Sequence, residues 1–284
     1  MTQAQPEDGL FRIIDNLDDV DDVDSCEDDA TTHFLPTRFA GGPWNPSHQH
    51  GGAVSGLLTR ALHQFASPVP MRLARITVEM FRGVPMSPLR IETRILRAGR
   101  RIQSVEANLF DKETQVARAS GLRVRCEPAM SSLETTEKLD PILGMPPEGD
   151  IPPFQPRDGF EFPPGFINAI DFSREDPPKS GEPSTVWVRL RCRLTEDEDT
   201  APILRLATLA DFASGTGNDV DYSKYTSINP DLTIHVLRAP RSEWLGIRGI
   251  TRRAGDGIGQ SSAIIHDLEG PIANVSASLL LDRR

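Results

Sequence analysis

One carboxyl group stands out because of its surroundings. Residues 203–214 are largely apolar, and Asp211 is the only acidic side chain among them. An ionised carboxylate is costly in an apolar setting unless hydrogen-bond donors hold it, and such groups are frequent where protons are moved. We therefore take Asp211 as a candidate general base. The structural alternative is a local hydrogen bond to Ser214 or Thr216 near the end of a helix.

A pair of glycines in the first half of the chain could supply hydrogen-bond donors. Gly51 and Gly52 open a second apolar stretch, residues 51–65. If this stretch is a helix, its first N–H groups are unpaired donors at the positive end of the helix dipole. His50 can either donate to a bound carbonyl or satisfy a buried backbone group. Glycine pairs also mark tight turns and helix packing, which is the structural alternative.

The elements that must position these residues repeat along the chain. Each apolar stretch predicts a helix, and a run of strands follows each helix. The predicted strands cover 71–81, 89–98, 102–110 and 114–124 in the first half, and 225–238, 244–251, 257–266 and 271–281 in the second. Earlier strands are predicted at 32–39, 166–172 and 184–193.

The alternation of Leu89, Ile91, Thr93 and Ile95 with charged residues is typical of an antiparallel sheet that buries one face. A helix that is apolar nearly all round is expected to be wrapped by such a sheet. The sequence therefore predicts an α+β protein with two modules, residues 31–126 and 165–284. A segment with nine prolines, residues 127–164, is expected to be an extended linker between them.

Charge and composition exclude several classes of protein. The net charge of the 284 residues is -10, but nine of the 41 acidic residues lie within residues 15–29, and the remainder is nearly balanced. We expect residues 1–30 to form a solvated acidic segment. A calcium loop there would lack its central glycine. No basic stripe is available for nucleic acid, so no nucleic-acid partner is expected.

The sequence also predicts neither a membrane span nor a cofactor. No apolar run of about 18 residues occurs, and residues 1–10 are polar, so we expect a cytoplasmic protein. The three cysteines lack the spacing of a zinc or redox pair. His48, His50 and His63 have no carboxylate or cysteine at a spacing that completes a metal shell.

Several motifs together resemble one family. The first half carries Gly42-Pro43-Trp44-Asn45-Pro46, then His48 and His50-Gly51-Gly52. The second half carries LADFASG at 209–215, SINPDLTIH at 227–235, EWLG at 243–246 and GIG at 257–259. In order and spacing these motifs resemble double-hotdog acyl-CoA thioesterase-like proteins, similar to type II acyl-CoA thioesterases, from about residue 32 onwards. The resemblance implies a double hotdog, an acyl-CoA substrate and a homo-oligomer, a dimer or higher.

The resemblance also implies roles for particular residues. Thioester hydrolysis needs an activated water and donors for the developing oxyanion. Asp211 is then the base, and Ser227, with Thr226 as its alternative, helps to hold the water. Gly51, Gly52 and His50 face the carbonyl oxygen. Because the acid and the glycines lie in different modules, we expect one composite site per chain. The further substrate-binding candidates within the matched motifs are Asn45 and Asn229.

One departure from the family leaves alternatives open. The relatives carry a glutamine on the last strand, where this sequence has Ala277 or Ser278. Hydrolysis can then be weakened or altered, or the chain can bind acyl-CoA or an acyl carrier protein without cleaving it. Gln260 compensates only if its strand faces the site. Enoyl-CoA hydration, suggested by Asn45-Pro46-Ser47-His48, would need an acid where Pro43 stands.

Overall fold

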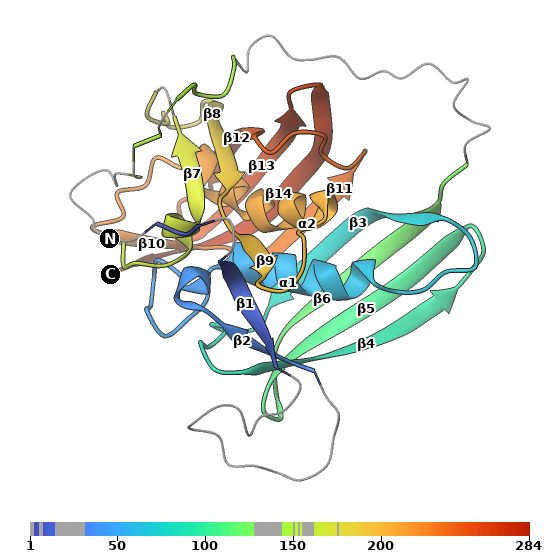
Figure 1. Ribbon diagram of the computed structural model, residues 1–284. Helices are drawn as coiled ribbons and strands as arrows, with labels where there is room; N and C mark the ends of the chain where they lie inside the picture. The colour runs from blue at the N-terminus through green and yellow to red at the C-terminus, as the bar shows by residue number, and fades with distance from the viewer. Residues whose placement is uncertain are drawn as a thin grey trace.

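The computed structural model describes residues 3–5, 8–14, 32–127, 144–149, 151–152, 154, 162–174 and 176–284. Most of the predicted acidic segment, with the calcium loop considered in it, and most of the predicted linker lie outside these residues. The described strands form one large sheet, curled around centrally placed helices (Figure 1). Within the described part of the chain, no helix is both long and apolar enough to cross a membrane.

The elements follow one another in two similar series. The first series is β1 (Gly9–Ile14), β2 (His33–Pro36), α1 (Gly51–His63), β3 (Met71–Met80), β4 (Leu89–Ala98), β5 (Ile102–Asp111) and β6 (Thr114–Arg125). The second series is β7 (Ile170–Ser173), β8 (Ser184–Leu190), β9 (Arg193–Thr195), α2 (Pro202–Leu209), α3 (Ala213–Thr216), β10 (Tyr225–Ile228), β11 (Asp231–Val236), β12 (Leu245–Arg253), β13 (Ile258–Asp267) and β14 (Gly270–Arg283).

The strand order in the sheet repeats on either side of one central pair. From the centre outwards it runs β3, β6, β5, β4, β2, β1 on one side and β11, β14, β13, β12, β8, β7 on the other. The halves meet where β3 and β11 pair antiparallel, with Thr77 opposite Thr233 and their hydroxyls 3.2 Å apart. The predicted repeat in the order of elements is therefore confirmed. Two strands depart from it, since β9 pairs with β1 and β10 pairs with β14.

The two central helices pack so closely that glycine is required between them. A Cβ on Gly52 would lie 2.4 Å from the carbonyl oxygen of Thr208, and one on Gly56 would lie 2.1 Å from its hydroxyl oxygen. At the other end of α1, Arg60 forms an ion pair with Glu198, which precedes α2. The helices therefore run antiparallel and side by side (Figure 1), and the end of α2 lies against the start of α1.

Several predicted elements are broken or shortened. The helix predicted at 203–214 ends at Leu209 and continues as a 3-10 turn, η6 (Ala210–Phe212), before α3; such tightening is common at helix ends. The strand predicted at 225–238 splits into β10 and β11 because Pro230 has no N–H for the ladder. Short 3-10 turns, η2 (Arg38–Ala40) and η5 (Phe166–Ala169), replace parts of the strands predicted at 32–39 and 166–172.

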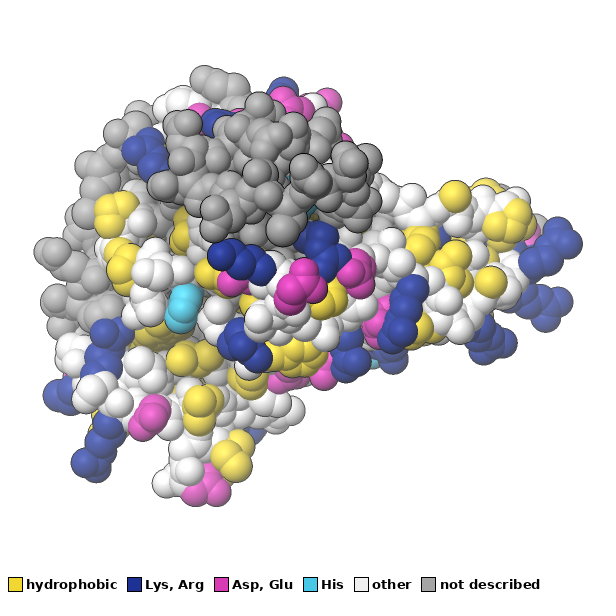
Figure 2. Space-filling view, turned by 90° about the horizontal axis from the view of Figure 1, so that it is seen from below, with side chains coloured by type: hydrophobic (Ala, Val, Ile, Leu, Met, Phe, Trp, Pro, Cys, Tyr) yellow, Lys and Arg dark blue, Asp and Glu magenta, His cyan; other side chains and the backbone are white. Residues whose placement is uncertain are grey.

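Two further differences concern the edges of the sheet. The strand predicted at 184–193 ends at Leu190, and β1 was not predicted. The alternation along β4 buries Leu89 but leaves Ile95 exposed, because the strands run past the end of α1 (Figure 1). Figure 2 shows hydrophobic side chains among Lys and Arg on this projecting end, where Leu96 and Ile102 are also exposed.

The contact between α1 and α2 generates a stability prediction. Gly56→Ala would force the two helices apart, and overpacking of this kind costs about 1–3 kcal/mol of unfolding free energy. Urea unfolding followed by circular dichroism measures the loss. Gly215→Ala is the control, because its nearest Cβ contact would be 3.8 Å away, and we expect a change within about 0.5 kcal/mol. Equal stability of the two variants would contradict the packing argument.

Candidate active site

Asp211 lies in η6, where the end of α2 meets the start of α1. Its residue is 4% exposed, and its carboxylate rests directly against Gly51. A Cβ on Gly51 would lie 2.9 Å and 3.0 Å from the two carboxylate oxygens. Only glycine at position 51 leaves room for this approach. The structure therefore brings together the acid of the second half and the glycine turn of the first.

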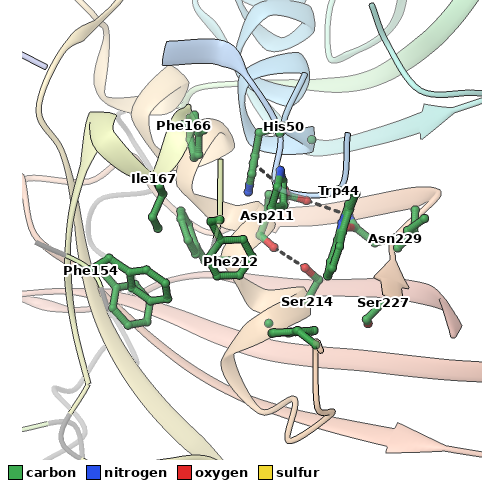
Figure 3. A pocket seen from close by; sticks show the side chains of 18 of the residues that line it. Trp44, His50, Phe154, Phe166, Ile167, Asp211, Phe212, Ser214, Ser227 and Asn229 are labelled. Atoms are coloured by element: carbon green, nitrogen blue, oxygen red, sulfur yellow. Dashed lines mark hydrogen bonds and ion pairs between the residues drawn. The ribbon is translucent and has the colours of Figure 1, made fainter. Parts of the chain in front are cut away.

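Both oxygens of the Asp211 carboxylate have a side-chain neighbour (Figure 3). Asn229 Nδ2 donates to Oδ1 at 2.7 Å, and His50 Nδ1 lies 3.1 Å from Oδ2. The hydroxyl of Ser214 donates to the main-chain carbonyl of Asp211, and that of Thr216 donates to Phe212. The hydroxyls of Ser214 and Thr216 therefore do not donate to the carboxylate. Its side-chain partners come from other elements of the fold.

His50 caps the first turn of α1. Its Nδ1 accepts the N–H of Gly52 at 3.0 Å, and its ring stacks on Phe166 with centroids 4.3 Å apart. Burial lowers the pKa of His50 below 6.5, and the negative charge of Asp211 offsets part of this effect. The imidazole is therefore neutral near pH 7. Of the two roles considered from the sequence, satisfying a buried backbone group is the one that the structure displays.

His50 Nδ1 can either accept a hydrogen bond from Gly52 or donate one to Asp211, depending on whether it carries a proton. The same nitrogen faces the Gly52 N–H and the Asp211 carboxylate. When Nδ1 accepts the N–H of Gly52, it has no proton to donate to Asp211 Oδ2. When Nδ1 carries the proton, it donates to Asp211 instead, and the Gly52 N–H loses its acceptor. The choice of which His50 nitrogen carries the proton thus decides whether the Gly52 N–H has an acceptor.

Gly51 and Gly52 differ in what their N–H groups can reach. The Gly52 N–H is held by His50, and Gly52 does not line the cavity beside Asp211. Gly51 does line it, and the hydrogen bonds found among the described residues give its N–H no acceptor. Gly51 is therefore the better-placed of the two predicted donors.

The remaining predicted residues are divided between the cavity and other faces. Ser227 and Asn45 line the cavity. Ser227 accepts a hydrogen bond from Asn218, and Asn45 accepts one from the Ser47 N–H. Thr226 does not line it and is directed instead to the main-chain carbonyl of Asp282.

The positions examined for the missing glutamine lie away from the cavity. Ala277 is buried within the sheet, 3% exposed. Ser278 and Gln260 pair with each other across β13 and β14, and both are exposed. Since none of the three lines the cavity, Gln260 does not compensate for the glutamine. The carboxamide that contacts Asp211 belongs to Asn229, whose partnership with the acid the sequence analysis did not foresee.

The cavity beside Asp211 is large and rich in aromatic side chains. Its volume is about 1390 Å³. Sequence reasoning missed the phenylalanines that line it, although five of the 12 in the chain lie within residues 154–172. The described ones are Phe81, Phe154, Phe162, Phe166, Phe172 and Phe212. Within the described residues, no cluster of His, Cys, Asp or Glu is suited to hold a metal ion.

Comparisons with solved structures define the class of this fold. A hotdog-fold protein from Alicyclobacillus acidocaldarius superposes with a TM-score of 0.67 at 15% identity, covering 89% of this chain and 93% of the other. A putative thioesterase II from Thermobifida fusca gives 0.63 at 17% identity, covering 89% and 92%. An acyl-CoA thioesterase II from Mycobacterium marinum gives 0.61 at 17% identity, covering 82% and 89%. The fold is thus a hotdog fold.

Family models make the assignment more specific. Those for the N-terminal and C-terminal domains of acyl-CoA thioesterases match residues 40–124 and 146–281. The chain belongs to the acyl-CoA thioesterase family, as the sequence motifs indicated. A search of curated proteins found no match.

The depressed pKa of His50 generates a prediction about pH. Because the unfolded chain takes up this proton first, the contribution of His50 to stability should be constant above about pH 6.5 and fall as the pH is lowered towards the folded-state pKa. His50→Asn keeps a capping acceptor but cannot titrate, so its stability should fall less steeply. Urea unfolding from about pH 8 to about pH 5.5 measures both slopes.

The control for this experiment is His235→Gln, because His235 is exposed on β11. It should keep the slope of the wild-type protein. Identical slopes for the wild type and His50→Asn would show that His50 is not buried in its neutral form.

Proposed function

We propose that this protein is a double-hotdog acyl-CoA thioesterase, which hydrolyses an acyl-CoA to the free acid and CoA with a water activated by Asp211. The observation that carries the proposal is the contact between the Asp211 carboxylate and Gly51 at the start of α1. A carboxylate and a helix N-terminus that share the wall of one cavity support the proposal. Membership of the acyl-CoA thioesterase family supports the substrate class.

The proposal includes the modular organisation. One hotdog module comprises residues 31–126 and the other residues 165–284, with residues 127–164 as linker. Residues 1–30 were expected to be a separate acidic segment, but β1 within them pairs with β2, and its buried Leu10 and Phe11 make it part of the first half of the sheet. The repeated strand order around β3 and β11 supports this division. The site then draws Gly51 and His50 from the first module and Asp211, Ser227 and Asn229 from the second.

We assign the activation of the attacking water to Asp211. In the proposed step its carboxylate takes a proton from water as the water oxygen bonds to the thioester carbon. Asn229 Nδ2 fixes one carboxylate oxygen at 2.7 Å, and its amide oxygen can accept a hydrogen bond from the water. Ser227, which lines the same cavity, is a further partner for that water. The intermediate then expels the CoA thiolate. The proton that Asp211 took from water passes to this thiolate.

The developing oxyanion needs donors that are already in place. We assign the Gly51 N–H to this role, with the positive end of the α1 dipole behind it. Gly52, the second donor expected from the sequence, is held by His50 and does not line the cavity, so it helps to fix the turn at the start of α1. His50 is thus a positioning residue in this proposal, and Asn45 is assigned to substrate contact at the rim. No metal or other cofactor takes part.

A second candidate function is binding of acyl-CoA or an acyl carrier protein without turnover. It is favoured by the absence of Ala277, Ser278 and Gln260 from the cavity lining. Enoyl-CoA hydration ranks lower, because Pro43 lines the cavity where that chemistry would require an acid. The proposed active form is a homo-oligomer, supported by the exposed Ile95 and Leu96 at the projecting end of the sheet.

Loss of the carboxylate tests the proposed function directly. Asp211→Asn should lower thiol release from a panel of acyl-CoAs by about a hundredfold or more, since the amide cannot take the proton. Asp256→Asn, in the exposed loop after β12, is the matched control and should keep wild-type rates. Near-normal activity of folded Asp211→Asn would refute the mechanism. Wild-type protein that releases no thiol yet is stabilised by acyl-CoA would favour the binding function.

Asn229 supplies a separate prediction. Asn229→Ala removes the donor to Asp211 Oδ1, and a hydrogen bond to a charged group is worth about 1.5–3 kcal/mol. We expect kcat/KM to fall about tenfold to a hundredfold. Asn274→Ala on the exposed face of β14 is the control, measured in the same thiol-release assay. An unchanged rate for Asn229→Ala would remove this residue from the water-holding group.

A further inference from the structure

One side of the cavity is a lobe built from phenylalanine rings. Phe166 stacks on Phe212 with centroids 6.0 Å apart, and Phe212 lies 6.0 Å from Phe172. Phe154 meets Phe172 edge-on at 4.9 Å and lies 5.7 Å from Phe162. Figure 3 shows Phe154, Phe166 and Phe212 on one side of Asp211, and Trp44, Asn229 and Ser227 on the other. We call these five phenylalanines the aromatic lobe.

The aromatic lobe begins at the reacting position. Phe166 also stacks on His50, whose Nδ1 lies 3.1 Å from Asp211 Oδ2. A group bonded to a carbonyl carbon beside Asp211 can therefore enter the lobe without a spacer. The rings present both faces and edges, since the interplanar angles range from 24° for Phe166 and Phe212 to 90° for Phe154 and Phe172.

The chemistry of the lobe does not suit the nucleotide half of coenzyme A. Besides the rings, the lining of the cavity includes the apolar Ile151 and Ile167 together with Ser173 and Arg174, and phosphates need cations. Arg174 lies over Phe172 at 5.5 Å, but its Nη2 donates to the carbonyl oxygens of Gly215 and Thr216. The acyl group is therefore the part of the substrate that fits here.

On the basis of the proposed function, we propose that the preferred substrates carry an aromatic ring in the acyl group, and that Phe154 is a specificity-determining residue. A straight alkyl chain gains only burial in the lobe. An aryl group gains burial and, in addition, edge and face contacts with several rings, each of which contributes beyond buried area. Phe154 comes from outside the two helices that hold Asp211 and Gly51, so selection of the acyl group is separate from the proposed catalytic groups.

Three thioesters with equal numbers of acyl carbons test the proposal, namely phenylacetyl-CoA, cyclohexylacetyl-CoA and octanoyl-CoA. We expect kcat/KM to be highest for phenylacetyl-CoA. Phe154→Leu should lower the ratio of phenylacetyl-CoA to octanoyl-CoA about threefold to tenfold, with octanoyl-CoA itself little changed. Phe110→Leu, on β5 beside Arg90, is the control and should leave the ratio unchanged.

Several results would overturn the proposal. Equal rates for phenylacetyl-CoA and cyclohexylacetyl-CoA would show that shape, not aromaticity, is selected. A preference for octanoyl-CoA would show that the lobe does not select an aromatic acyl group. An unaltered ratio of phenylacetyl-CoA to octanoyl-CoA in Phe154→Leu would show the same. The same acyl groups on N-acetylcysteamine lack the nucleotide. If Phe154→Leu slows both CoA thioesters equally and leaves the N-acetylcysteamine thioesters unaffected, the lobe holds adenine and the acyl assignment is wrong.

A binding measurement separates failure of the thioesterase proposal from failure of the proposed aromatic preference. If no thioester is hydrolysed, the thioesterase proposal fails, and the inference is then decided by binding. Phenylacetyl-CoA should raise the melting temperature of the wild-type protein more than octanoyl-CoA does, and Phe154→Leu should abolish the difference. Equal stabilisation by the two compounds would overturn the inference independently of catalysis.

Discussion

The site depends on one contact between the ends of two helices. Asp211 follows α2, Gly51 begins α1, and the absence of a side chain on Gly51 lets the carboxylate rest on the backbone there. A negative group at a helix N-terminus is favoured by the dipole and by the unpaired N–H groups. The two halves of the chain thereby meet at the point where the proposed mechanism requires both a base and an oxyanion donor.

The rest of the fold holds this contact in place. Gly52 and Gly56 let α1 and α2 approach over Thr208, and the pair formed by Arg60 and Glu198 fixes the opposite ends. The 3-10 turn at Asp211 ends the regular helix just where its side chain must leave the α2 core. The sheet closes around the helices through the pairing of β3 with β11. Helix packing, rather than a loop, therefore sets the position of the acid.

The sequence predicted the order of elements because apolar periodicity and turn residues are local signals. It also singled out Asp211 and Gly51, since a lone acid in an apolar stretch and a glycine pair at a helix start are visible without coordinates. It did not reveal that Asn229 contacts Asp211. That contact depends on the break at Pro230 and on the distance between β11 and η6, which no local pattern encodes.

The aromatic lobe escaped prediction for a related reason. Phe154 and Phe162 lie in a proline-rich segment whose composition predicts a linker, and nothing in that composition says which surface the rings contact. The burial of β4 was overestimated as well, because alternation indicates which side chains share a face but not how far α1 extends to cover them.

A double-mutant cycle on Gly51 and Asp211 tests the central claim most directly, with thiol release from acyl-CoA as the readout. Gly51→Ala should displace the carboxylate and slow hydrolysis, and the combination with Asp211→Asn should be no slower than Asp211→Asn alone, because both changes remove the same unit. Losses that simply multiply, or full activity of Gly51→Ala, would contradict the account.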